Sequence, residues 1–329
     1  MTVVFVVSTP GKLLVLQLAQ VSMLLFIMLN VPVYAGSLSP IGSSGGMTSS
    51  TPNGADDFLL GVQPPPGLYL LNYSFYYTSD RFNTTDGKKV STGPLSDFKR
   101  DIYGDIARFV WVPKRDIRIF GGKLVSDIGF PIVHKRIKTT AFDKSKGGLG
   151  DIIFAPINLF YRWNNFHTIW YVDFIASTGS YDKHDPVNIG NNHWTFKPAI
   201  AVTYWAEPWE ISGIFHFDIH TKNRDFIDPR NGRETSHKTG ETFHLDYAVS
   251  RAIIPGLRAG ITGYYWKDVS RDEVGGDSVP HTQTEVFSFG PGLKWDFQRI
   301  TFIFKMHYEV DAQNRPEGQY WWLRINYRF

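Results

Sequence analysis

The twelve residues GQYWWLRINYRF, from Gly318 to Phe329, decide the fold. Successive side chains of a β-strand point to opposite faces, so every second residue shares a face. One face of this segment carries Gln319, Trp321, Leu323, Ile325, Tyr327 and Phe329, and all of these residues except Gln319 are apolar. The other face carries Tyr320, Trp322, Arg324, Asn326 and Arg328. The pattern predicts a strand. Because Phe329 belongs to the apolar face, we expect this strand to be held in place, although chain ends usually fray.

Eleven further segments have strand-like patterns of similar length. They are 67–79, 101–112, 117–130, 149–162, 167–180, 192–206, 209–222, 240–251, 256–267, 283–297 and 299–311. Strands of soluble proteins are usually about 5–6 residues long, so these segments are unusually long. The sequence therefore predicts an all-β fold.

The connections between these segments alternate between long and short. The short ones are 113–116, 163–166, 207–208, 252–255 and 298, whereas the intervening ones are longer, polar and Gly-rich. Up-and-down barrels of the bacterial outer membrane have tight periplasmic turns and longer outer loops. A sheet can span hydrocarbon only if it closes on itself, because every backbone N–H and C=O there needs a partner. We therefore predict a transmembrane antiparallel β-barrel of about 12 strands over residues 67–329, with both termini in the periplasm.

A secreted β-sandwich or a soluble barrel is the alternative fold. It would explain the alternation and the Gly-rich turns. It would not explain so many long strands with aromatic ends, nor the aromatic residue Phe329 at the end of the apolar face. The membrane barrel is thus the better interpretation, and Phe329 is then expected in an aromatic girdle at the membrane interface.

Residues before the barrel divide into two segments. Residues 1–35 have the charge, apolar core and small residues of a secretory signal peptide, with cleavage expected after Ala35. A membrane-spanning helix is the alternative, because the apolar run is close to the roughly 20 residues that a helix needs to cross a bilayer. Residues 36–66 are rich in Gly, Ser and Pro and are predicted to form a periplasmic segment, with 61–67 at or inside the periplasmic mouth.

Composition excludes several classes of protein. The chain of 329 residues has no cysteine, which excludes a disulfide framework and thiolate chemistry. Its formal charge of +3 is small for this length, so we expect no nucleic-acid partner.

Several motifs resemble a known family. They are FLLGVQPPPGLYLLNYSFYYTSD (58–80), GLGDIIFAPINLFYRW (148–163), TGSYD (178–182), NNHWTFKPAIAVTYW (191–205) and TGETFHLDYAVSRAIIPGLRAGITGYYWKD (239–268). Together they are similar to the phenol meta-pathway degradation proteins, and the resemblance covers nearly all of the mature chain. It implies an outer-membrane channel that takes up small hydrophobic or aromatic compounds for phenol catabolism. The stretch GYYWKDVSRDE (263–273) departs from the family pattern beside an outer loop, which leaves the substrate's identity open.

Two other functions stay open beside uptake. One is a barrel enzyme that acts on lipids, although we find no outward His beside an outward Ser on adjacent predicted strands, as a hydrolase would need. The other is a plugged structural barrel. A barrel of this size lies between those filled by side chains and those with an aqueous channel, so a narrow, partly occluded passage is expected.

Inward positions supply the candidates for the substrate path. By the predicted parity they are Tyr76, Trp205, His216, Asp218, His220, His244, Asp246, Arg258, Tyr264, Trp266, Lys305, His307, Tyr320, Trp322, Arg324 and Arg328. Aromatic faces can stack on planar ligands, and the cations can hold a phenolate or a carboxylate. Bracing of the barrel interior is an equally good interpretation for each of these residues.

Five of these candidates could also form a metal site. His216, Asp218 and His220 share a face of one strand, and His244 and Asp246 have matching parity on the next. Alternate residues of one strand are about 7 Å apart, so the cross-strand register decides whether they converge. A hydrogen-bonded polar wall is the simpler interpretation, and we predict neither a metal nor another cofactor.

Further partners follow from the membrane setting. The terminal strand ending in Phe329 resembles the signal by which barrels are recognised by the outer-membrane assembly machinery. Loops 86–90 and 134–148 carry Lys and Arg where lipopolysaccharide and other lipids would present phosphates. Simple solubility of the loops would explain these charges equally well.

Overall fold

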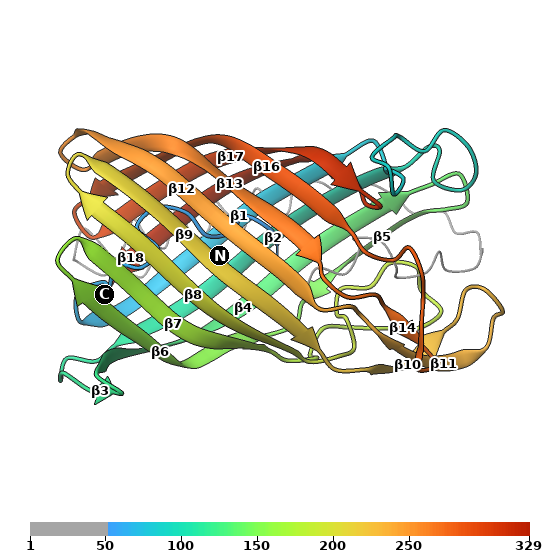
Figure 1. The fold of residues 1–329 in the computed structure, drawn as a ribbon, viewed down its shortest axis with the longest axis horizontal. Helices are drawn as coiled ribbons and strands as arrows, with labels where there is room; N and C mark the ends of the chain where they lie inside the picture. The colour runs from blue at the N-terminus through green and yellow to red at the C-terminus, as the bar shows by residue number, and fades with distance from the viewer. Residues whose placement is uncertain (1–51) are drawn as a thin grey trace, which may run out of the picture. The chain divides into compact units, whose positions relative to one another are not determined.

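The computed structural model describes residues 52–329, and its main feature is a closed antiparallel barrel of twelve strands (Figure 1). The barrel strands are β1 (Gly67–Ser79), β2 (Lys99–Val112), β4 (Gly122–Lys138), β6 (Ile153–Trp163), β7 (Phe166–Ile175), β8 (Thr195–Ala206), β9 (Trp209–His220), β12 (Thr242–Ile254), β13 (Leu257–Asp268), β16 (Glu285–Phe297), β17 (Ile300–Gln313) and β18 (Gln319–Arg328). Each pairs with the next along the chain. No helix among the described residues is both long and apolar enough to cross a bilayer. The predicted fold is confirmed; residues 1–51 lie outside the described part, including the predicted signal peptide.

The ring closes between its first and last strands. β1 and β18 pair through ten residue pairs, from Tyr69 opposite Arg328 to Thr78 opposite Gln319. The backbone N–H of Phe329 donates to the carbonyl of Leu68 at 3.0 Å, so the terminal residue is tied to the same seam. Neither of these two strands is therefore an open edge. A sheet surrounded by hydrocarbon requires such closure, because unpaired backbone groups there find no water.

Both ends of β4 differ from the predicted strand. The predicted strand 117–130 starts instead at Gly122, because a short hairpin with β3 (Arg118–Ile119) precedes it. Phe120 and Gly121 have φ angles of 51° and 82°, which form the tight turn of this hairpin. At its other end β4 runs on to Lys138 and pairs with β5 (Asp143–Leu149), so most of the predicted loop 131–148 is a hairpin.

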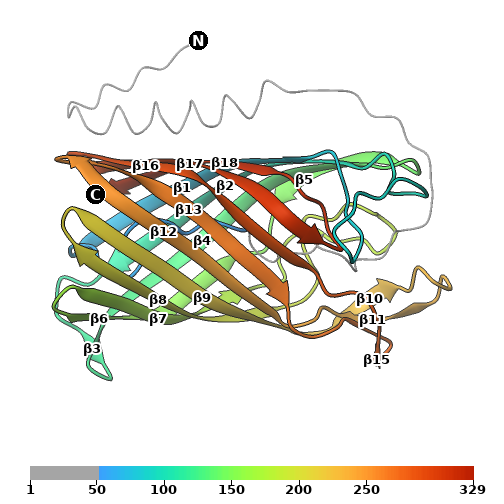
Figure 2. The same cartoon turned by 45° about the horizontal axis from the view of Figure 1, so that its top comes forward.

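The two ends of the barrel differ, and we name them for their connections. The short-turn end carries the β3 hairpin and the tight turns. The loop end carries a separate small sheet of β10 (Asn223–Ile227), β11 (Glu234–Lys238), β14 (Glu273–Val274) and β15 (Asp277–Ser278) (Figure 2). The predicted alternation of short and long connections thus places the tight turns at one end of the barrel and the long loops at the other.

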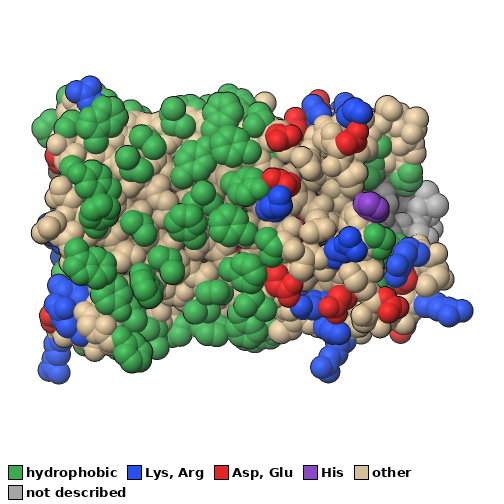
Figure 3. Space-filling view, viewed as in Figure 1, with side chains coloured by type: hydrophobic (Ala, Val, Ile, Leu, Met, Phe, Trp, Pro, Cys, Tyr) green, Lys and Arg blue, Asp and Glu red, His purple; other side chains and the backbone are tan. Residues whose placement is uncertain are grey.

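The outer face of the wall is apolar over most of the strand region. Figure 3 shows hydrophobic side chains gathered there, with charged side chains concentrated toward the loop end. On β9 the outward residues remain 38–55% exposed: Trp209, Ile211, Phe215, Phe217 and Ile219. A contiguous apolar surface of this kind marks contact with a membrane or another protein, and here it forms a belt around a closed barrel.

The outer face of β1 and β2 interrupts this belt. Asp105 accepts hydrogen bonds from the side chains of Asn72 and Ser74, both at 2.6 Å. Tyr76, predicted to point inward, belongs to this outer face and stacks on Tyr103 at 4.5 Å. The prediction was wrong because β1 has aromatic residues at consecutive positions, Phe75 to Tyr77, so alternation alone does not fix its inner face.

Candidate functional site

The described residues that precede β1 run through the lumen, and we call residues 53–66 the strap. Phe58 is 3% exposed and packs in one cluster with Ala248 and Ile303. It also lies over Gly292, where an added Cβ would come within 2.7 Å of the phenyl ring. The segment predicted to be periplasmic is therefore, in its described part, packed inside the barrel from the short-turn end. Composition predicted that this segment forms no core of its own, and 61–67 was expected at or inside the periplasmic mouth. The burial of Phe58 in the core of the barrel was not predicted.

An ionic anchor holds the strap at Asp57. Its carboxylate is fully buried and lies 2.7 Å from Nη2 of Arg324 and 3.1 Å from Nζ of Lys305. Lys305 also donates to the backbone carbonyls of Ala55 and Asp56, each at 2.9 Å. Buried charges are stable only when they are paired and hydrogen-bonded, so the two lumenal cations and the strap carboxylate depend on one another.

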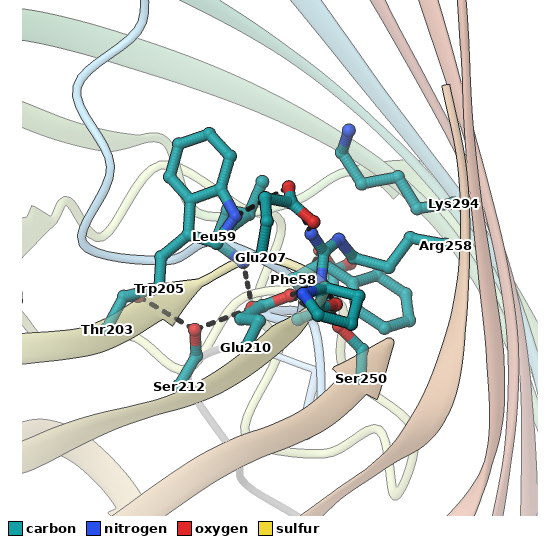
Figure 4. Close-up of polar contacts among 12 residues, drawn as sticks. Phe58, Leu59, Thr203, Trp205, Glu207, Glu210, Ser212, Ser250, Arg258 and Lys294 are labelled. Carbon is teal, nitrogen blue, oxygen red and sulfur yellow. Dashed lines mark hydrogen bonds and ion pairs between the residues drawn. The ribbon is translucent and has the colours of Figure 1, made fainter. Parts of the chain in front are cut away.

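A second anchor uses hydrogen bonds around Glu210 on β9 (Figure 4). The carboxylate accepts the backbone N–H of Leu59 and the hydroxyls of Ser212 at 2.7 Å and Ser250 at 2.6 Å. Nη1 of Arg258 lies 3.7 Å away. Further along the strap, the N–H of Gly61 donates to the Thr203 hydroxyl at 2.9 Å. The strap forms a single turn here, in which the N–H of Val62 donates to the carbonyl of Leu59, but no helix or strand, so the wall supplies acceptors for Leu59 and Gly61.

The predicted histidine and aspartate cluster is only partly assembled. His216 and His244 are opposite each other on β9 and β12, with ring centroids 5.1 Å apart. Asp246 pairs with His244 and accepts the N–H of Asp56 at 3.0 Å. The register leaves two members elsewhere: Asp218 faces Lys197 at 3.8 Å, and His220 bonds Thr195 at 2.9 Å. In the part of the chain that the structure describes, no group of three or more such residues is arranged to hold a metal ion.

The other predicted inward residues occupy two regions. One is a buried aromatic cluster that contains Tyr264, Trp266, Tyr320 and Trp322. His307 lies beside it and bonds the Thr262 hydroxyl at 2.8 Å.

The second region is the short-turn end. There Trp205 donates to Glu207 at 2.8 Å, and Arg258 pairs with the same carboxylate at 2.9 Å. Arg328 reaches the carbonyl of Pro66 at 2.9 Å, where the strap leaves the lumen.

Several lumenal acids were missed from the sequence. Asp57 lay in a segment without a strand pattern. Glu210 lay on the predicted inward face of its strand, and an acidic residue on a membrane-spanning strand could have indicated a functional position. Asp127 and Asp173 were missed likewise, and both pair with Arg108, at 2.8 Å and 3.1 Å. These ion pairs join the inner faces of β2, β4 and β7.

A buried histidine at the loop end was also missed. His193 precedes β8, is 4% exposed, and stacks edge-on against His220 at 5.1 Å. Burial, together with the neighbouring His220 and His237, lowers the pKa of His193 to about 3. The imidazole is therefore neutral, and it packs between the barrel rim and the small loop sheet.

Two cavities lie beside the strap. A cavity of about 50 Å³ is lined by Asp56, His216, His244 and Asp246. A cavity of about 520 Å³ opens at the short-turn end beside Val62 and Gln63. Benzene occupies an engineered protein cavity of about 150 Å³, so the inner cavity is too small for an aromatic ring while the strap is seated.

Comparisons with known proteins agree with this architecture. The model of the family described as "Putative MetA-pathway of phenol degradation" matches residues 79–325. An outer membrane channel from Pseudomonas putida F1 superposes with a TM-score of 0.73 at 19% identity, covering 83% of this chain and 99% of that chain. The similarity shows a shared barrel fold. None of the curated proteins matches this sequence.

Two further solved structures are less similar. The β domain of the Bordetella autotransporter BrkA has a TM-score of 0.48 at 10% identity, covering 80% of this chain and 100% of that chain. The TodX monoaromatic hydrocarbon channel, in a deletion mutant, has a TM-score of 0.48 at 10% identity, covering 89% of this chain and 99% of that chain.

Proposed function

Because this chain belongs to the family of the MetA-pathway of phenol degradation, we propose that it is an outer-membrane channel for the uptake of small hydrophobic or aromatic compounds that feed phenol catabolism. The observation that carries the proposal is the strap. It crosses an aromatic-lined lumen and is held there by non-covalent contacts with the wall, such as those of Asp57 with Arg324, Leu59 with Glu210 and Gly61 with Thr203. A segment held in this way can be displaced without opening the barrel wall.

Passage then requires the strap to move. A monoaromatic compound does not fit the inner cavity of about 50 Å³, whereas it fits the cavity of about 520 Å³ at the short-turn end. Leu59 and Gly61 lie in the chain between Asp56, which lines the inner cavity, and Val62, which lines the outer one, so we infer that their release from the wall joins the two spaces. Their partners Glu210 and Thr203 would keep other hydroxyl neighbours, so this half of the strap is the easier one to release.

The same proposal places the chain in the outer membrane with both termini in the periplasm. The even number of strands and the tight turns at the end where the strap leaves support this orientation. Lipopolysaccharide would then contact the loop end, where Arg136 and Lys138 extend on the β4–β5 hairpin. The strand ending in Phe329 would be the feature that the assembly machinery recognises.

Uptake by cells tests the proposal directly. A Gram-negative strain that grows on phenol should grow more slowly at low phenol concentration when the gene is deleted, and normally when it is restored. Growth at high concentration serves as the control, because diffusion then suffices. Equal growth of the two strains at low concentration would contradict transport and favour the plugged structural barrel. Release of fatty acid from phospholipid by the purified barrel would instead favour an enzyme.

A further inference from the structure

The cavity of about 520 Å³ at the short-turn end has a composition of its own. We call it the vestibule. Its size lies within the roughly 300–1,000 Å³ of small-molecule sites. Val62 and Gln63 of the strap line it together with residues of β3, β4, β6, β7 and β8. It lies apart from the wall around Asp57, which consists of β17 and β18.

Cations outnumber anions in the vestibule lining. Arg118, Lys123 and Arg162 line it, and no carboxylate does. Arg118 is compensated by Asp116, with Nε and Oδ2 3.0 Å apart, on the exposed hairpin. Among the described residues, neither Lys123 nor Arg162 forms an ion pair, and Arg162 donates only to the Asn164 carbonyl at 3.3 Å. The vestibule therefore presents uncompensated positive charge to a ligand.

Aromatic rings provide the apolar part of the same lining. Phe160 is buried on β6, and Trp205 is oriented by the bond from its indole N–H to Glu207 and by the ring of His167, 5.9 Å away. Flat aromatic ligands gain from stacking on such rings, and a carboxylate gains from Arg and Lys donors. Only a ligand that has both groups uses the whole lining.

We propose that the vestibule is a binding site for aromatic carboxylates, the ring lying against Phe160 and Trp205 and the carboxylate facing Lys123 and Arg162. The inference rests on the proposed uptake function and narrows its substrate class. A phenol hydroxyl has a pKa near 10 and is neutral at pH 7, so simple phenols would use only the aromatic part of the site. The vestibule would therefore bind aromatic acids more tightly than phenols.

A binding experiment that does not depend on transport tests this site. The full chain in phosphatidylcholine nanodiscs is titrated with 4-fluorobenzoate and with 4-fluorobenzyl alcohol, and ¹⁹F NMR line widths report binding. We expect saturable binding of the acid, at least about tenfold tighter than that of the alcohol and weakened by salt. Lys123→Gln and Arg162→Gln should each weaken the acid about tenfold, and Trp205→Leu should weaken both probes. Circular dichroism checks that each variant folds.

Lys114→Gln is the matched control, because Lys114 is exposed near the same hairpin but does not line the vestibule. Equal affinity for acid and alcohol, or unchanged affinity in both Lys123→Gln and Arg162→Gln, would overturn the proposal. Loss of acid binding in nanodiscs that contain phosphatidylglycerol would overturn it too, by showing that lipid phosphate occupies the site. If these binding tests contradict the proposed site but growth on dilute phenol still depends on the gene, the uptake function stands and only the binding site is refuted.

Discussion

Two of the anchors that hold the strap use different forces. At Asp57 one carboxylate is fully buried between the cations of Lys305 and Arg324. At the second anchor, the carboxylate of Glu210 accepts the backbone N–H of Leu59. It also accepts the hydroxyls of Ser212 and Ser250, which belong to the wall and stay in place when the strap leaves. Removing the strap would leave Lys305 and Arg324 unpaired in the lumen, whereas Glu210 would stay largely satisfied. The first anchor therefore fixes the strap and the second lets its far half move.

Asp57→Ala should have the largest effect. Breaking a buried ion pair by removing one partner costs about 3–5 kcal/mol, which shifts the equilibrium of the seated strap more than a hundredfold. Single-channel conductance in planar bilayers should rise accordingly. Replacing the whole group, as Asp57→Leu with Lys305→Met and Arg324→Met, should restore a closed lumen because no charge is left unpaired. An unchanged conductance of Asp57→Ala would refute the ionic anchor.

Glu210→Gln should have a smaller effect. A hydrogen bond to a charged group contributes about 1.5–3 kcal/mol, and the amide keeps one acceptor oxygen. The N–H of Leu59 should exchange with deuterium faster, while that of Phe58 beside Asp57 should change little. Equal acceleration at both residues would show that the two anchors act as one.

Gly61→Ala tests where the strap crosses the wall. An added Cβ would lie 2.4 Å from the carbonyl oxygen of His167, which forces the strap away at a cost of about 1–3 kcal/mol. We expect faster proteolysis of the strap without unfolding of the barrel. Gly148→Ala is the control, because a Cβ there meets no atom within 4 Å. If both variants resist protease like the native chain, the close approach at Gly61 does not hold the strap.

Thr203→Val should have the smallest effect. It removes the acceptor of the Gly61 N–H, which is a net change of about 1 kcal/mol. The expected result is faster exchange of the Gly61 amide alone, and Thr203→Ser should behave like the native chain. A conductance change as large as that of Asp57→Ala would reverse the ranking of the two anchors.

The barrel could be predicted from the sequence because its physics is periodic. On β9 the same alternation gives both the apolar outer face and the polar inner face, so Trp209 and His220 marked a real strand of nearly the predicted length. Where both faces of a strand carry aromatic residues, as around Tyr76, alternation does not reveal which face is the inner one. Side-chain pattern also did not foresee the turn at Phe120, because its backbone φ of 51° is uncommon for a non-glycine residue.

The site was harder to predict because it depends on register and on a segment without periodicity. Placing His216 opposite His244 requires the exact offset of two strands, and a shift of two residues would have brought Asp218 there instead. Asp57 offered no strand pattern, and its partners lie 248 and 267 positions further along the chain, at Lys305 and Arg324. Local patterns carry no information about contacts of this separation.

The seam between β1 and β18 has a consequence for assembly of the barrel. The strap leads directly into β1, while β18 is the last barrel strand in chain order. Because the strap lies within the ring and continues into β1 at Gly67, pairing of β1 with β18 closes the barrel around it. We therefore expect the strap to enter the lumen before β1 and β18 pair.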